Sequence, residues 1–165
     1  MWSNPKQQLT HYGTNMKVIH SLPPNYDQIA KVLHISTTPG LVFTYGDSVY
    51  LPSGGTLPDH LEAHESVHIR QQTAMGPEKW WKKYLQDPDF RLSQELEAYI
   101  AEYKFVKENY NRQVRRKLQT HIINSLSSHI YGNLVGKDLA YKLIMEGLEW
   151  AIILFNTERR LRPHS

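Results

Sequence analysis

Two histidines four residues apart, with a glutamate directly after the first, constrain this chain more than any other feature of its sequence. They are His64, Glu65 and His68 in the pentapeptide HESVH. Positions i and i+4 of a helix lie on the same face, so a helix brings both imidazoles to one point. Glu65 is rotated away from that pair by one position. The pattern therefore predicts a helix through this segment.

The residues on either side of the motif favour the same helix. Thr56 is suited to cap the helix, Pro58 to occupy its first turn, and Asp59 to stabilise its positive end. We expect the helix to run to about Gln72, before the break at Gly76 and the proline that comes after it.

The rest of the chain reads as mostly helical after a small β element. The run Gly46-Asp47 between two β-prone segments predicts a tight hairpin. The expected strands are 16–20, 41–45 and 48–51. The first expected helix starts at Asn25 or Asp27 and runs through Ile29, Val32 and Leu33. The others cover a short segment around Trp80 to Leu85, 90–110, 113–126 and 137–156, the last bent at Gly147.

Composition limits the class of protein. The 165 residues are 40% hydrophobic and 21% charged, with a net charge of +3, which suits one α+β domain over 1–165 with a flexible tail at 157–165. The chain contains no cysteine, which excludes disulfides, thiolate metal sites and cysteine nucleophiles. We see no signal peptide or transmembrane segment and expect a cytoplasmic protein.

The HExxH pattern carries a specific chemistry. Two neutral imidazoles can bind zinc, which lowers the pKa of a bound water towards about 7. Glu65 then serves as the catalytic base that accepts the proton of that water. His60 continues the histidine stripe but is too far along the helix to bind the same ion, so we interpret it as a bystander at the rim.

The motif, with a glutamate on the next long helix, resembles the zincin metallopeptidases of the gluzincin type. The resemblance covers roughly residues 41–103 and implies a minimal zincin-like fold. It implies Glu95, in the segment Glu95-Leu96-Glu97-Ala98, as the third zinc ligand, with Glu97 as the alternative. Some families have an aspartate after the small residue to orient a histidine, whereas this chain has Tyr99.

The resemblance also implies further parts of a peptidase. Zincins stabilise the oxyanion with a donor from a later segment, and His129 and Tyr131 are the candidates here. They also lay the substrate backbone along a strand before the active-site helix, which implies 48–51 or the preceding strand.

The sequence thus predicts a zinc-dependent hydrolase, a peptidase that acts on a peptide or protein, with a cell-wall peptide as another substrate for the same chemistry. The alternative is a binding or assembly protein that retains a zincin-like fold without turnover. Its basic clusters lack interleaved aromatics, so nucleic acid is not an expected partner. Assembly into an oligomer is compatible with the sequence, and small zincins of this size are typical of microbial and viral genomes.

Overall fold

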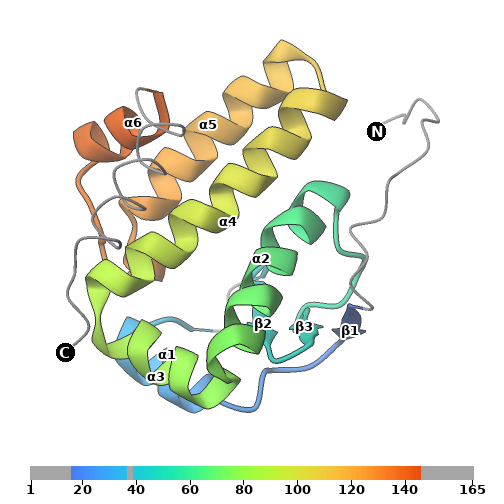
Figure 1. The fold of residues 1–165 in the computed structure, drawn as a ribbon, viewed down its shortest axis with the longest axis vertical. Helices are drawn as coiled ribbons and strands as arrows, with labels where there is room; N and C mark the ends of the chain where they lie inside the picture. The colour runs from blue at the N-terminus through green and yellow to red at the C-terminus, as the bar shows by residue number, and fades with distance from the viewer. Residues whose placement is uncertain (1–15, 37–38, 146–165) are drawn as a thin grey trace.

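The computed structural model describes residues 16–36 and 39–145 of the chain (Figure 1). These residues form a three-stranded sheet and six α-helices, so the α+β prediction of a mostly helical chain with a small N-terminal β element is confirmed. In chain order the elements are β1 Lys17–Ile19, α1 Tyr26–Leu33, β2 Phe43–Tyr45, β3 Ser48–Tyr50, α2 Asp59–Met75, α3 Pro77–Gln86, α4 Pro88–Asn109, α5 Arg112–Leu126, the 3₁₀-helix η1 His129–Tyr131, and α6 Lys137–Met145.

Some predictions concern the C-terminal part of the chain. The last helix begins at the predicted position, Lys137. Its predicted continuation to residue 156, the bend at Gly147 and the flexible tail at 157–165 lie outside the described residues. Within the described residues, no helix is long and apolar enough to cross a membrane.

The sheet has β3 in its middle. The β2–β3 hairpin is antiparallel with Thr44 opposite Val49, and β1 adds in parallel on the other side of β3. Gly46 opens the two-residue turn with a φ of 64°, which glycine adopts at no steric cost. Val49 is buried against Ile69 of α2, so the sheet packs on the helix that carries the histidine pair.

The start of α2 differs from the prediction. The helix begins at Asp59, and Pro58 before it is extended, with φ −65° and ψ 146°. The prediction that Thr56 caps the helix and Pro58 lies in its first turn is therefore wrong. A proline disfavours the helical conformation in the residue before it, so Leu57 cannot join the first turn. Asp59 and Glu62 do lie at the positive end of the helix.

Helix α2 is buried on every side in its middle. The seven consecutive residues from 63 to 69 are all buried, polar and apolar alike. The sheet covers one side of this stretch and α4 another, while α3 contacts its C-terminal half. A surface helix would have an exposed stripe, so this segment is a central helix of the fold.

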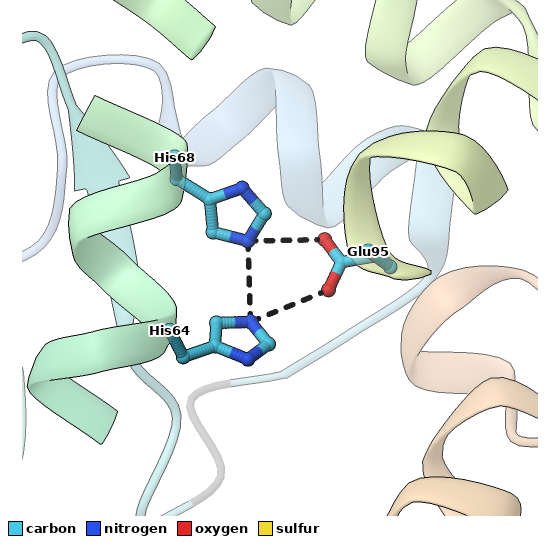
Figure 2. Close-up of side chains that lie close together, drawn as sticks. All are labelled: His64, His68 and Glu95. Atoms are coloured by element: carbon cyan, nitrogen blue, oxygen red, sulfur yellow. Dashed lines mark hydrogen bonds and ion pairs between the residues drawn. The ribbon is translucent and has the colours of Figure 1, made fainter. Parts of the chain in front are cut away.

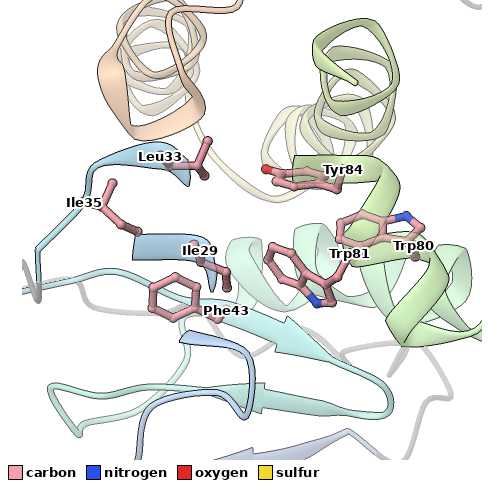
Figure 3. Close-up of a cluster of buried hydrophobic side chains, with 7 residues drawn as sticks. All are labelled: Ile29, Leu33, Ile35, Phe43, Trp80, Trp81 and Tyr84. Atoms are coloured by element: carbon pink, nitrogen blue, oxygen red, sulfur yellow. The ribbon is translucent and has the colours of Figure 1, made fainter. Parts of the chain in front are cut away.

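Two apolar clusters each place one ring against a histidine of α2, Trp80 against His68 and Tyr99 against His64. One joins α1 and the segment after it to β2 and α3, and Figure 3 shows its side chains converging: Ile29, Leu33, Ile35, Phe43, Trp80, Trp81 and Tyr84. The other holds α4 against α5 and α6 through residues that include Tyr99, Val106, Leu118, Ile122 and Leu126. The polar face between α2 and α4 therefore lies between two hydrophobic cores.

Asp87 fixes the start of α4. Its carboxylate accepts the N–H of Phe90 at 3.0 Å, and Pro88 occupies the first turn. This arrangement satisfies one of the free amides at the helix end and sets where α4 begins.

We predict that Asp87→Ala lowers the free energy of unfolding by about 1 kcal/mol, because the Phe90 amide loses its acceptor. Urea denaturation followed by far-UV circular dichroism measures the change. Asp87→Asn is the matched control, since its side-chain oxygen still accepts the bond and the loss should be a small fraction of that for alanine. Equal losses in the two variants would contradict the capping role.

Candidate metal centre

The two histidines of α2 point to one place. His64 and His68 lie one turn apart on the same face of the helix, and their Nε2 atoms are 3.2 Å apart (Figure 2). Both side chains are buried. The i to i+4 geometry expected from the sequence is therefore present, and both imidazoles present the same ring nitrogen.

Glu95 of α4 completes a group of three. Its Oε2 lies 3.5 Å from Nε2 of His64 and its Oε1 lies 3.4 Å from Nε2 of His68 (Figure 2). The three ligand atoms all lie within 4.8 Å of one another, and all three residues are buried. The structure thus brings together the three residues predicted as ligands, in a group that could hold a metal ion.

Hydrogen bonds on the far side of each imidazole decide which nitrogen is free. Nδ1 of His64 lies 3.1 Å from a carboxylate oxygen of Glu102, and Nδ1 of His68 lies 2.9 Å from Oε1 of Gln71. The amide nitrogen of Gln71 donates to the carbonyl of Gln94 and to Glu97, which fixes its oxygen towards His68. When both Nδ1 atoms donate to these acceptors, the Nε2 lone pairs are the ones that a metal ion in the group would use.

One carboxylate oxygen of the group makes no hydrogen bond in the part of the chain that the structure describes, and Nε2 of His64 lies 3.5 Å from it. Oε2 of Glu95 is buried without a hydrogen bond, whereas Oε1 accepts the hydroxyl of Tyr84 at 2.7 Å. A buried carboxylate oxygen without a donor is costly, and a cation at this point would satisfy it together with the two Nε2 atoms. Two nitrogens and one carboxylate are the donors of many catalytic zinc sites, so the residues present fit such an ion.

Glu102 is a site residue that was not predicted from the sequence. It is buried, and besides His64 it accepts from Nδ1 of His60 at 2.8 Å. His60 is therefore a partner of Glu102 rather than a bystander. Glu102 lies seven residues after Glu95, which places both on one face of α4. This spacing is the feature of the sequence from which Glu102 could have been predicted as a site residue. Glu102 bonds with His64, and the ring of Tyr99 packs 4.6 Å from that of the same histidine.

Glu97 lies outside the group of three. Its carboxylate is exposed and pairs with Arg70 at 2.6 Å, and it also accepts from Gln71 at 2.8 Å. Gln71 also bonds with His68, so Glu97 helps to orient that histidine through Gln71 without contacting it. The choice of Glu95 over Glu97 as the ligand agrees with this geometry.

The charges around the group favour a cation. Burial lowers the pKa of His64, but the neighbouring carboxylates of Glu102 and Glu95 outweigh burial and raise that pKa to about 10. Burial raises the pKa of Glu95, but the two histidines outweigh it and leave the pKa below its ordinary value. The pKa of Glu102 is also lowered, since bonds from His60 and His64 overcome its burial. Both carboxylates are therefore ionised at neutral pH.

Glu65 is held beside the group, on the side of the sheet. Its Oε2 accepts the hydroxyl of Thr44 in β2 at 2.7 Å, and the side chain is buried. The carbonyl of Thr44 accepts from Gln72 at 2.9 Å and from Trp81 at 3.1 Å, which fixes the strand. Glu65 is thus positioned without belonging to the group of three.

The two predicted oxyanion donors lie differently. Tyr131 lines the same cavity as the three residues, and its hydroxyl lies 2.9 Å from that of Tyr99. Burial, followed by the charge of Glu95, raises the pKa of Tyr131 well above its ordinary value, so it stays neutral and can donate. His129 is exposed and is not among the residues that line the cavity. Two residues apart in a 3₁₀-helix, the two side chains point in different directions.

Arg91 connects the parts of the site that carry the tyrosines. It is buried and donates to the backbone carbonyl of Tyr84, at the end of α3, and to that of Tyr131 in η1 at 2.8 Å. Its guanidinium also lies over the Tyr84 ring, 5.7 Å from the ring centre. One side chain of α4 therefore positions both of these tyrosines.

A cavity of about 580 Å³ opens onto the three residues, Glu65 and Tyr131. Its volume is in the range of binding sites for small molecules or short segments of chain. On the side of α1, β2 and α3 its wall is apolar (Figure 3), formed by Ile29, Leu33, Ile35, Phe43 and Trp81. A substrate that extends to this wall would place an apolar group there.

The predicted strand for substrate pairing needs correction. β3, which covers most of 48–51, is the middle strand, so both of its edges are already paired and it cannot accept another. The preceding strand, β2, is an edge strand and lines the cavity through Phe43 and Thr44. The carbonyl of Thr44 is already occupied by side chains of α2 and α3. Pairing of a substrate with β2 stays a prediction.

Comparisons with protein-family models, with curated proteins and with solved structures found no match to this chain. The similarity to gluzincins therefore rests on the motif and stays a prediction. The geometry of His64, His68 and Glu95 is independent of that similarity, because it results from the packing of α2 on α4.

We predict that purified wild-type protein binds about one zinc ion per chain and that Glu95→Ala abolishes this binding, because two histidines alone form a weak site. Elemental mass spectrometry after loading and desalting measures the stoichiometry. Glu97→Ala is the matched control and should keep the metal. Retention of zinc by both variants would show that Glu95 is not a ligand.

We predict that Glu102→Gln weakens zinc binding about tenfold to a hundredfold, since His64 loses the carboxylate that holds its Nδ1 proton. Competition with a chromophoric chelator measures the affinity. Glu108→Gln, an exposed position on the same helix, should bind zinc as the wild type does. Equal affinity in the two variants would contradict the role of Glu102.

Proposed function

We propose that this protein is a zinc-dependent peptidase that uses His64, His68 and Glu95 as metal ligands and Glu65 as the catalytic base. The observation that supports this most is the buried group of three, which has a carboxylate oxygen without a hydrogen bond and a separate glutamate at the same cavity. Zinc, when bound, would supply a Lewis acid that polarises a carbonyl and acidifies water.

The side chains of this chain would perform the remaining steps. Glu65, held by Thr44, would accept the proton of the attacking water and pass it to the leaving nitrogen. Tyr131, kept neutral by burial, would donate a hydrogen bond to the oxyanion that develops on the carbonyl. The cavity next to these groups would hold the segment of substrate that carries the bond that is cleaved.

A non-catalytic metal site is the competing proposal, and the neighbours of the group argue against it. A structural zinc site has four protein ligands. His60 is bound to Glu102, and Glu97 is bound to Arg70 and Gln71, so neither of these two residues can reach the group without breaking its contacts. A group of three next to a cavity supports an open fourth position, which catalysis requires.

We predict that Glu65→Gln retains zinc and the unfolding midpoint of the wild type but loses at least a hundredfold in the hydrolysis of peptides, because the base is absent. Cleavage of a mixture of unstructured peptides, followed by mass spectrometry, measures the activity. Glu62→Gln, on the same helix and outside the cavity lining, is the matched control and should keep activity.

Two results would contradict this proposal. Full activity of Glu65→Gln would exclude the proposed base. Absence of cleavage by zinc-loaded wild-type protein would favour the binding or assembly protein.

A further inference from the structure

One wall of the cavity differs from the others in its chemistry. Whereas α1, β2 and α3 present mostly apolar groups, α5 contributes Lys117, His121 and Ser125 to the lining beside Val114 and Leu118. These residues are four apart, so they form one stripe along the helix. Lys117 and His121 are exposed, and Ser125 is half-buried.

The stripe leads from the surface to the metal group. Ser125 and Tyr99 line the same cavity, and the ring of Tyr99 contacts that of His64. The Ser125 hydroxyl also lies 3.5 Å from Nε2 of His121. From Ser125 outward to Lys117 the helix rises about 12 Å, which is the length of roughly four residues of an extended peptide.

Helix α5 is strongly cationic. It contains Arg112, Arg115, Arg116 and Lys117 and no acidic residue. Among the described residues, none of these four cations forms an ion pair with a carboxylate. The carboxylates in the cavity lining, Glu65 and Glu95, are held by Thr44 and by Tyr84 with the two histidines. Lys117 therefore has no acidic partner within the cavity.

We propose that the α5 stripe binds a carboxylate of the substrate, so that the substrates are polypeptides with an acidic residue three or four positions from the bond that is cleaved. This inference rests on the proposed peptidase function. An extended chain that passes the metal group would lie beside Tyr99 and Ser125 and then reach Lys117. The opposite, apolar wall would accept a large apolar side chain near the cleaved bond.

The test uses the full-length, zinc-loaded Glu65→Gln protein, which we expect to bind peptides without cleaving them. The probes are fluorescein-labelled peptides with a central leucine in an alanine and serine background. They carry glutamate, glutamine or lysine four residues from the leucine, on either side. Fluorescence anisotropy measures each dissociation constant, at low salt and at high salt.

We expect one glutamate peptide to bind about threefold or more tighter than its glutamine counterpart, as for an exposed ion pair, with the preference reduced at high salt. Lys117→Glu should reverse this preference towards the lysine peptide. Arg116→Glu makes the same charge change on the same helix, outside the cavity lining, and should leave the preference unchanged.

The outcomes separate this inference from the proposed function, because wild-type protein is tested for cleavage of the same peptides. Cleavage without any preference for glutamate overturns the inference alone. Glutamate-dependent binding without cleavage overturns the peptidase function and keeps the anion site. An equal effect of Arg116→Glu and Lys117→Glu, or no binding of any peptide, overturns the inference.

Discussion

The whole site depends on the buried contact between α2 and α4. Histidines of the first helix face carboxylates of the second, and all of these side chains except His60 and Glu97 are buried. Burying such groups is unfavourable unless each is paired, so a good register is a condition for folding. A shift of one helix by a single turn, about 5.4 Å, would separate Glu102 from His64 and Glu95 from His68 together. The same contacts that make the fold specific therefore position the ligands.

Neutral side chains and one arginine around the contact between α2 and α4 form hydrogen bonds that stabilise it. Tyr84 donates to Glu95 from the end of α3, Gln71 and Gln94 fix His68, and Arg91 holds the backbones of both Tyr84 and Tyr131. The site is thus built from α2, α3, α4 and η1, each tied to the others by buried hydrogen bonds. Such a frame favours ligand atoms that are already in place before an ion arrives, which reduces the entropic cost of binding it.

Local periodicity and turn chemistry in the sequence predicted most of the elements around the site. Spacing indicated the helix around His64 and His68, and the turn residues indicated the hairpin at Gly46. The resemblance to gluzincins pointed to Glu95, and the structure places it with the two histidines. The role of Glu102 was not predicted from the sequence. Its contact with His64 depends on how α4 lies against α2, and no local sequence pattern specifies how two helices cross.

Two other predictions, the strand that a substrate would pair with and the placement of His129 at the site, differ from the structure for the same reason. The position of β3 in the middle of the sheet depends on the parallel addition of β1, a contact between segments about thirty residues apart. The exposure of His129 beside the buried hydroxyl of Tyr131 depends on the direction in which η1 meets α4. Contacts between segments that are distant in the sequence depend on tertiary packing, and local sequence patterns predict such contacts only in part.

The burial of α2 on all sides has a consequence for how this chain can vary. An ordinary amphipathic helix tolerates change at two or three positions in every turn, so its tolerance to substitution rises and falls with the helical period. None of the residues from 63 to 69 is exposed, so we expect substitutions to be poorly tolerated at all of these consecutive positions. Divergence of the chain would then accumulate around this block, and HESVH would persist even in descendants that had lost every other trace of common origin.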